Sequence, residues 1–531
     1  MTVGSSFFYT FDALIVKLSE MSTTIKKKKS FVDIFLNGVE RVGNVLPHPA
    51  LLFGIFAVIV LLFSGLFAWM GATASHPTTH ETINVINLLS VDGLRRILTE
   101  MVKNFTSFAP MGIVVVAMLG IGLAEKSDLI GALIRKLVLA APKGLLTFVI
   151  ILAGVISNVA SSVGYVLLVP LGGVIFLVAK RHPLVGMAAA FAGVSGGFSA
   201  NLIIGTIDPL LAGLTEEAAH IVDKTYTVNP VSNYYFMVVS TFMVALVGTW
   251  VTEKIIAPRF GEYKGEVSEE ETRLDKLSKT EKKGLRWVGI VSFIFLGLMA
   301  WGLIPADGFL RGADGGLLSS PLLKGVVAVL FLWAGTCGIV YGKITGTFKT
   351  DKDIMGAMGE SAKSLGPYLV LVFFAAQFVA YFNWSNLGLV LAVNGANAIN
   401  ELNMSVVPLM LMFTLFCGMI NLVMGSASAK WALLAPIFVP MFMMLGYSPE
   451  LTQVVYRIGD SATNVISPMM SFFALIIVYF QKYDEKAGIG TIVSTMLPYS
   501  MVFMVSWMIL LAIWLLTGLP LGPTGGLHYA M

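Results

Sequence analysis

The sequence predicts an all-α, polytopic membrane protein with about nine transmembrane helices. Of its 531 residues, 56% are hydrophobic and only 12% are charged, and the mean hydropathy is +0.83. A soluble core cannot bury so much apolar surface, and the apolar runs are long enough for helices to cross a hydrocarbon layer of roughly 30 Å. These runs also lack the alternation of polar and apolar residues that is typical of membrane β-barrels.

Net charge, cysteine content and missing motifs exclude several classes of function. A formal net charge of +4 over this length leaves no dense basic surface beyond one run of four lysines, so we expect no nucleic-acid partner. The two cysteines lie far apart within apolar runs, which excludes a disulfide framework or a CxxC metal site. The sequence has no HExxH motif and no Walker loop, which argues against ATP-driven transport by this chain alone.

Residues 1–30 are interpreted as an N-terminal cytoplasmic extension. Met1 to Glu20 form an amphipathic segment that carries acids, unlike the apolar centre of a cleavable signal. Translation could instead start at Met21. Lys26–Lys29 then indicate a cytoplasmic anchor under the positive-inside rule.

Two membrane halves follow, at residues 31–258 and 287–517, and a charged linker at 259–286 separates them. Several of the apolar spans are too short to cross a membrane and are interrupted by Gly, Pro, Ser or Asn, which is typical of discontinuous helices and re-entrant hairpins. In chain order the spans are Leu51–Met70, Phe108–Ala124, Leu145–Ile156, Val166–Ala179, Tyr234–Ile256, Trp287–Ile304, Leu322–Tyr341, Pro367–Phe382, Val406–Val423, Leu433–Leu445, Phe472–Phe480 and Leu497–Leu516.

Charge also predicts the orientation of the chain. The linker carries eight Lys or Arg and seven Asp or Glu in 28 residues, so it belongs in the cytoplasm together with Lys180 and Arg181. The C-terminal tail, residues 518–531, has no Lys or Arg and is expected in the periplasm. Opposite locations of the two termini require an odd number of crossings, and nine crossings plus two hairpins would fit.

The two halves carry a weak internal repeat. Ser162–Pro170 aligns without gaps onto Ser428–Pro436, and a second Ser/Asn-rich break follows in each half, at Ser199–Asn201 and at Ser461–Asn464. Irregular backbone at membrane depth survives only where protein or a water-filled cavity satisfies it, so paired breaks predict a secondary-transporter site near the midplane. The alternative is chance similarity between short apolar stretches. Candidate cation ligands or hairpin-tip residues are Asn158, Ser162, Asn201, Ser461 and Asn464.

Three ionisable residues, Asp208, Arg457 and Asp460, lie in apolar surroundings. A charge at membrane depth is costly unless it is paired or hydrated, which makes each of them a functional candidate. Arg457 and Asp460 share one helix face, so the alternative for them is a structural ion pair with each other. Asp208 has no cation nearby in the sequence. A partly dehydrated carboxylate can load and release a proton, as a proton-coupled carrier requires.

The stretch around Trp431 leaves several interpretations open. The indole could stack on an aromatic cargo, anchor a helix at the membrane interface or simply pack against neighbouring side chains. Lys430 could pair with a cargo carboxylate, or it could snorkel toward the interface or cap a helix. Four prolines of the second half predict kinks or hairpin ends. They are Pro436, Pro440, Pro449 and Pro468.

Six longer motifs are distributed over both halves. They are Asn44–Pro49, Lys103–Thr106, Ala190–Gly197, Gly205–Gly213, Gly425–Ala432 and Pro468–Ser471. Together they resemble the p-aminobenzoyl-glutamate transporter (AbgT) family, and the similarity covers essentially everything after about residue 31.

The resemblance implies a carrier of the bacterial inner membrane that forms bowl-shaped homodimers. Each subunit would have nine crossing helices, two re-entrant hairpins and the inverted repeats of the ion-transporter superfamily. Coupling roles would fall on Asp208 and Asp460. Lys430 departs from the family pattern, because some relatives have a neutral amide there, and it could alter the preferred charge of the cargo. The implied substrate pathway comprises Asn421, Ser428, Trp431, Pro449, Arg457 and Pro468.

These observations predict a secondary active transporter of p-aminobenzoyl-glutamate, or an exporter of sulfonamide-type antimetabolites, that is coupled to a proton or sodium gradient by alternating access. No cofactor is expected apart from the proton or sodium ion that drives transport. Alternatives are a sodium-coupled importer of other small organic anions, a channel and an intramembrane aspartyl protease. The protease is disfavoured because Arg457-Ile458-Gly459-Asp460 lacks the first glycine of a Gly-x-Gly-Asp pattern, and because a nearby Arg opposes a proton shared between two carboxylates.

Overall fold

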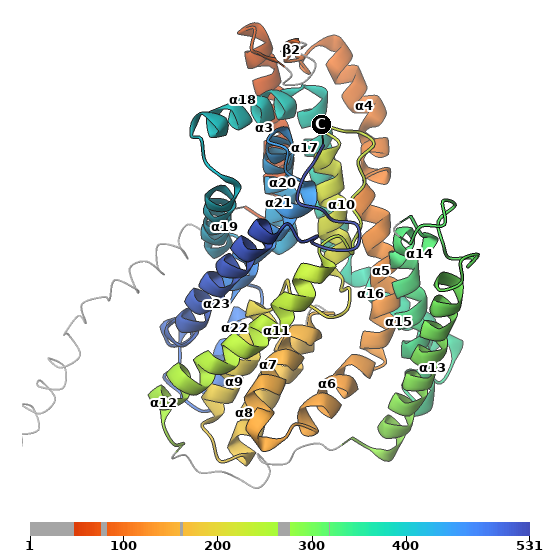
Figure 1. Ribbon diagram of the computed structural model, residues 1–531, viewed down its shortest axis with the longest axis vertical. Coiled ribbons are helices and arrows are strands. Elements are labelled where there is room, and N and C mark those ends of the chain that lie inside the picture. Colours follow the sequence, from red (N-terminus) through yellow and green to blue (C-terminus); the bar gives the residue numbers. More distant parts are fainter. Residues whose placement is uncertain (1–46, 76–81, 160–162, 264–276, 318, 531) are drawn as a thin grey trace, which may run out of the picture.

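The structure, a computed structural model, is an elongated bundle of helices with one two-stranded sheet in its described part (Figure 1). The predicted N-terminal extension, Ser162 and the middle of the charged linker lie outside the described residues. The described residues are 47–75, 82–159, 163–263, 277–317 and 319–530.

Nine helical segments of the described part are long enough and apolar enough to cross a membrane, which agrees with the predicted fold class. Two of these segments contain more than one helix: α4 and α5 form one, and α11 continues through a π-helical turn into α12. The helices are α3 (Pro49–Trp69), α4 (Val91–Thr106), α5 (Ala109–Lys126), α11 (Tyr234–Val251), α12 (Ala257–Phe260), α13 (Lys279–Leu303), α15 (Val326–Thr345), α17 (Gly366–Trp384), α19 (Val406–Val423), α20 (Ala427–Met444) and α23 (Ile489–Thr517).

The remaining elements are shorter. Strands β1 (Thr73–Ser75) and β2 (Thr82–Asn84) pair antiparallel, with Ala74 opposite Ile83. The other helices are α6 (Leu129–Leu139), α7 (Leu146–Ser157), α8 (Val169–Val178), α9 (Pro183–Phe191), α10 (Ile207–Ala219), α14 (Pro321–Lys324), α16 (Asp351–Ser364), α18 (Leu387–Glu401), α21 (Pro449–Asn464) and α22 (Phe473–Gln481).

The interrupted helices occur in the same order in both halves. In the first half a break follows α7 and another separates α9 from α10. Helix α11 follows and has no break between Tyr234 and Val251. In the second half a break lies between α19 and α20, another separates α21 from α22, and α23 is unbroken. Figure 1 shows α7 to α9 at the lower end of the molecule and α19 to α21 above them, below α18 and the strands at the top.

Two of these interruptions in the first half include π-helical turns. They cover Gly164–Leu168, before α8, and Ala192–Gly196, directly after α9. Such turns are rare and recur at functional sites, because the wider backbone frees carbonyl groups and redirects side chains. Both turns lie next to the polar breaks that the internal repeat predicted.

Local sequence sets the starts of the two helices that carry the site. The Ser426 hydroxyl accepts the N–H of Ala429 and caps α20, and the Ser448 hydroxyl accepts the N–H of Leu451 and caps α21. Pro449 occupies the first helical position of α21, where a missing N–H costs nothing. A proline there is a start signal, so the predicted hairpin end at Pro449 corresponds to a helix beginning.

The prolines of the second half differ in their effect. Pro468 lies in the break between α21 and α22, as predicted. Pro436 and Pro440 do not end a helix, because α20 continues through both of them. Buried neighbours on α18 and α10 pack against α20, and this packing outweighs the loss of single helix hydrogen bonds.

Helix α21 lies at the centre of the molecule although its sequence is strongly polar. All of its residues from Pro449 to Asn464 are buried. It packs against α19, α20 and α10, and α23 also contacts it. Since a polar helix cannot be buried without partners for its side chains, the neighbouring helices must supply them.

The close packing of α19 and α21 depends on Gly459. A Cβ atom at this position would overlap the carbonyl oxygen of Thr414 on α19. We expect Gly459→Ala to lower the free energy of unfolding by about 1–3 kcal/mol, because rigid backbone cannot move aside. Thermal unfolding of the detergent-solubilised protein measures this. Gly356→Ala on α16 is the control, because a Cβ there meets nothing within 4 Å; equal melting temperatures for the two variants would contradict the prediction.

Candidate functional site

The first part of the site is a buried contact between α20 and α21. The ammonium group of Lys430 donates to Oδ1 of Asp460 and to Oδ1 of Asn421, which lies on α19. The side chains of Lys430 and Asp460 are 0% and 1% exposed. The predicted snorkelling of Lys430 is therefore wrong. Helix α20 begins inside the protein, directly after the break that follows α19, so the lysine cannot reach the membrane interface.

Asn421 and Asn464 hold the remaining polar groups of this contact. Asn421 Nδ2 lies 2.7 Å from the backbone oxygen of Asp460, 2.9 Å from Thr463 Oγ1 and 2.9 Å from Asn464 Oδ1. Asn464 Nδ2 donates to Asp460 Oδ2 at 3.3 Å. Both carboxylate oxygens of Asp460 thus have donors, and three helices, α19, α20 and α21, fix their orientation.

The second part of the site joins the two halves of the chain. Arg457 Nη2 donates to Asp208 Oδ1 at 2.6 Å and to the carbonyl oxygen of Ser199 at 3.3 Å. Asp208 Oδ2 accepts the backbone N–H of Gly205 at 2.7 Å. Ser461 Oγ accepts the N–H of Ser199 at 3.0 Å. The second break of the first half is therefore bound directly to α21.

These contacts correct one interpretation of the charged residues. Arg457 and Asp460 share a face of α21, but they do not pair with each other. Arg457 pairs with Asp208 and Asp460 pairs with Lys430. Each carboxylate has its own cation, so the arrangement differs from a protease dyad, in which two carboxylates share one proton.

The guanidinium of Arg457 is only partly satisfied. Its Nε and Nη1 atoms are buried and have no hydrogen-bond partner among the described residues. A cavity of about 10 Å³ lies beside it and is also lined by Ser199, Ser240 and Trp507. This volume suits roughly one water molecule. In this conformation the cavity beside Arg457 is too small for a larger solute.

Trp431 lies deep in the protein next to Lys430. Its indole ring stacks on Tyr456, with ring centroids 4.5 Å apart, and its Nε1–H donates to Thr215 Oγ1 at 2.8 Å. The side chain is 0% exposed, so the indole packs in the interior, as one alternative predicted, and the interpretation as an interface anchor is wrong. Because Tyr456 covers one face of the indole, an aromatic cargo cannot stack on that face in this conformation. Ser428, one turn earlier, is partly exposed.

The other predicted residues lie at the breaks. Asn158 Nδ2 donates to the carbonyl oxygens of Val194 at 3.0 Å and Gly197 at 3.4 Å, and thereby joins the two interruptions of the first half. Its Oδ1 is buried without a partner among the described residues. Asn201 Oδ1 accepts the N–H of Leu202 and holds only its own loop. The predicted site residues thus divide into a contact group around Arg457 and Asp460 and a supporting group.

A chain of hydrogen bonds that the sequence did not reveal leads from Trp431 to Glu450, at the N-terminal end of α21. Thr215 Oγ1 donates to Gln453 Oε1 at 2.6 Å, Gln453 Nε2 donates to Asn233 Oδ1 at 2.8 Å, and Asn233 Nδ2 donates to the carbonyl oxygen of Glu450 at 3.1 Å. Their partners are more than 200 residues apart in the chain, and Glu450 resembles an ordinary acid in the first turn of a helix. No local signal distinguishes these residues.

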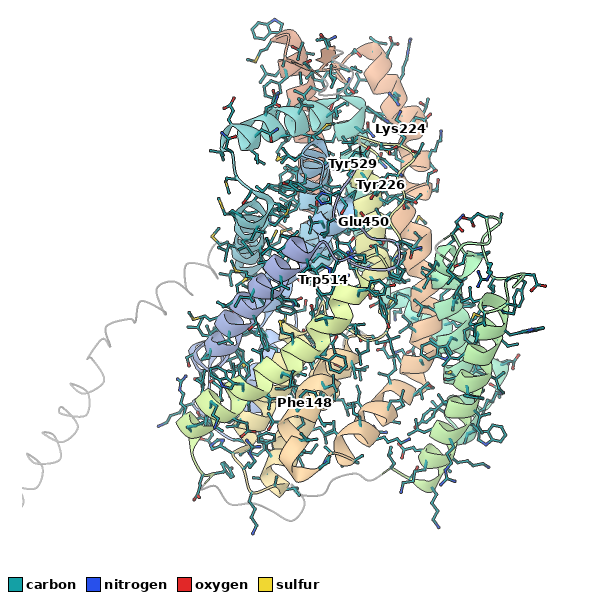
Figure 2. The ribbon with its side chains drawn as sticks, viewed as in Figure 1. Phe148, Lys224, Tyr226, Glu450, Trp514 and Tyr529 are labelled. Carbon is teal, nitrogen blue, oxygen red and sulfur yellow. The ribbon has the colours of Figure 1, made fainter. Side chains whose placement is uncertain are left out.

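Glu450 ends this chain in a partly buried hydrogen bond. The hydroxyl of Tyr226 donates to Glu450 Oε2 at 2.8 Å, and Figure 2 shows the two side chains together with Tyr529 near the end of α21. We expect Tyr226→Phe to lower the free energy of unfolding by about 1–3 kcal/mol, because a buried carboxyl oxygen loses its donor. Thermal unfolding measures this. Tyr235→Phe, at a side chain that is 43% exposed, is the control; similar shifts in both variants would contradict the prediction.

Comparisons with known proteins identify the family of the chain. A profile of the AbgT putative transporter family matches residues 34–529. The p-aminobenzoyl-glutamate transport protein of Escherichia coli (strain K12) is 37% identical over 486 residues, which is 91% of this chain and 95% of that protein.

Two solved structures have the same fold. The YdaH transporter of Alcanivorax borkumensis superimposes with a TM-score of 0.86 and 45% identity, over 90% of this chain and 100% of that one. MtrF of Neisseria gonorrhoeae, described with a class of antimetabolite efflux pumps, gives a TM-score of 0.87 and 50% identity, over 90% and 97% of the two chains. The chain therefore belongs to the AbgT family of membrane transporters.

Proposed function

We propose that this protein is a secondary active transporter that moves p-aminobenzoyl-glutamate, sulfonamide-type antimetabolites or both across the bacterial inner membrane by alternating access. The Escherichia coli relative is a p-aminobenzoyl-glutamate transport protein, and MtrF is described with antimetabolite efflux pumps. Both kinds of molecule combine an aromatic ring with polar groups, which suits the buried hydroxyl, amide and guanidinium groups that surround α21.

The single observation that carries this proposal is the ion pair between Arg457 and Asp208. It joins α21 of the second half to the start of α10 in the first half, and both side chains are nearly fully buried. Separating a buried ion pair is costly, because each charge is then left without a partner at this depth. A conformational change that separates the halves must supply new partners for these groups, and a charged cargo or coupling ion can do so.

We propose protons rather than sodium as the coupling ion. Asp460 and the side-chain oxygen of Asn421 are oxygen ligands of the type that hard cations prefer. The ammonium group of Lys430 already lies between them. A sodium ion in the same place would meet a positive charge at contact distance, whereas Asp208 and Asp460 can carry protons.

We further propose a homodimer whose C-terminal tail lies in the periplasm. The absence of Lys and Arg from residues 518–531 and the charged linker at 259–286 support this orientation. Cysteine labelling of intact cells tests the orientation, and light scattering of the purified protein tests the dimer.

Flux in proteoliposomes tests the function. Labelled p-aminobenzoyl-glutamate and a labelled sulfonamide are compared under a pH gradient without sodium, and under a sodium gradient without a pH difference. We expect saturable flux that responds to the pH gradient, and a strong loss of flux in Asp208→Ala at normal protein abundance. Flux that follows only the sodium gradient would favour a sodium-coupled importer, and ohmic currents far above carrier turnover would indicate a channel.

A further inference from the structure

A second polar cavity lies outside the site on α21. Its volume is about 310 Å³, and helices α4, α10 and α17 line it together with the start of α5; the pocket is open, and Arg96 and Lys103 at its edge are exposed. Helix α17 contacts α4 and α5, and α10 contacts α5. The side chains that matter for its chemistry are Arg96, Lys103, Asn104, Phe108, Glu217 and Trp384.

Its size distinguishes this cavity from the space beside Arg457. A volume of about 310 Å³ lies at the lower end of the range for small-molecule sites, whereas the 10 Å³ beside Arg457 suits one water molecule. Another cavity of about 350 Å³ is lined almost entirely by apolar side chains, such as Ile121, Leu133 and Ile156. Of these three cavities, only the one beside α4 has both the volume and the polar groups to hold a polar organic molecule.

Arg96 is the cation of this cavity that is available to a ligand. Its guanidinium carbon lies 4.2 Å from the centre of the Trp384 ring, which keeps the group in place by a cation–π contact. Arg96 has no ion pair among the described residues, whereas Lys103 pairs with Glu100 at 3.4 Å. A guanidinium held flat on an aromatic ring retains its N–H donors for bidentate binding of a carboxylate.

The opposite wall supplies acceptors in fixed orientations. Asn104 Nδ2 donates to Gln377 Oε1 at 2.9 Å, and Gln377, which is 4% exposed, donates in turn to the carbonyl oxygen of Met101. This arrangement leaves Asn104 Oδ1 to accept from a ligand. Glu217 Oε1 accepts the N–H of Ala109 at 2.9 Å and leaves its second oxygen available.

We propose that this cavity is a second binding site, for an aromatic carboxylate that also carries an N–H donor. The carboxylate would bind Arg96, the ring would lie against Phe108, and the N–H group would donate to Asn104 or Glu217. Helix α10 carries Glu217 near its end and Asp208 in its first turn, so the cavity is a holding site on the same helix as the transport site. Its identity as a cargo site depends on the proposed function, because p-aminobenzoyl-glutamate belongs to this chemical class.

The test is equilibrium binding and flux of labelled p-aminobenzoyl-glutamate with the full-length protein in lipid nanodiscs and proteoliposomes. Arg96→Gln should weaken binding and raise the KM of transport about tenfold, the loss typical of one charge-assisted hydrogen bond, while the maximal rate stays within about twofold. Arg96→Lys should lie between the wild type and Arg96→Gln, because it keeps the charge and loses the planar fork.

Arg95→Gln is the matched control. Arg95 is the neighbouring arginine on α4, its side chain is 75% exposed, it pairs with Asp92, and it does not line the cavity. Arg457→Met provides a second arm: it should abolish transport and still bind p-aminobenzoyl-glutamate, and this binding should weaken about tenfold when Arg96→Gln is added. The double variant thus separates the two sites.

The outcomes test the second binding site and the transport function separately. Binding and KM values of Arg96→Gln that equal those of Arg95→Gln would overturn the second site while leaving transport intact. Loss of all binding in Arg457→Met, or no binding to the wild type, would also overturn it. Binding that depends on Arg96 in a protein that moves no cargo under any gradient would support the site and contradict the transport function.

Discussion

Asp460→Asn is expected to abolish transport and to destabilise the protein by about 3–5 kcal/mol. The substitution leaves the ammonium group of Lys430 buried without a counter-charge, since the Lys430 side chain is 0% exposed and its other close partner is the amide oxygen of Asn421. A buried charge without its partner must be neutralised or hydrated, and both would disturb the packing of α19, α20 and α21. Thermal unfolding in detergent and flux in proteoliposomes measure the two effects.

A double variant separates the contribution of this ion pair to stability from its contribution to transport. Lys430→Met combined with Asp460→Leu replaces both charges by apolar side chains of similar size, which is often neutral or stabilising. We expect this variant to recover most of the stability and none of the transport. Asp92→Asn is the control, because its side chain is 93% exposed and its pair with Arg95 should contribute less than about 1 kcal/mol. Proton-driven flux in the double variant would refute a coupling role for this pair.

Asp208→Asn is expected to lower the transport rate by about a hundredfold, which corresponds to the loss of roughly 3 kcal/mol of interaction. Arg457 would lose its only carboxylate among the described residues, and its Nε and Nη1 atoms already lack partners there. The free guanidinium would also release the contact with Ser199, and so loosen the join between the first half and α21. Flux at equal protein abundance in the membrane measures the effect.

The charge reversal Asp208→Arg with Arg457→Asp tests whether the pair acts only as a link. We expect it to recover part of the stability and little of the flux, because the reversed carboxylate no longer lies at the start of α10. The control is Asp128→Asn, which removes another Asp–Arg pair. Asp128 pairs with Arg135 at 2.8 Å, and the Asp128 side chain is 56% exposed. Normal flux in Asp208→Asn would rule out the proposed role of this residue.

The fold class could be predicted from the sequence because it depends on local properties. The length and hydropathy of runs such as Val406–Val423, where α19 has the predicted bounds, report directly on membrane helices. The positions of the polar breaks and the candidates Asp208, Arg457 and Asp460 followed from the same logic, since a charge in an apolar run is conspicuous. Their pairing did not, because a single sequence gives no distances across the chain.

Lys430 illustrates this limit most clearly. Its neighbours in the sequence, Ser428 and Trp431, suit a helix end at a membrane interface, and a lysine there would normally extend to water. Its actual partner, Asp460, is 30 residues away, and Asn421 is nine residues away on the preceding helix. Thr215 and Gln453, which are 238 residues apart, carried no signal for the same reason.

The partner of Asp208 has a consequence for how the protein is made. Arg457 follows Asp208 by 249 residues, so at bacterial synthesis rates the ribosome needs about 10–50 s to reach it. During that interval the residue that pairs with Asp208 in the folded protein has not yet been made. The join between the first half and α21 therefore forms only after most of the second half has been synthesised, however early the first half folds.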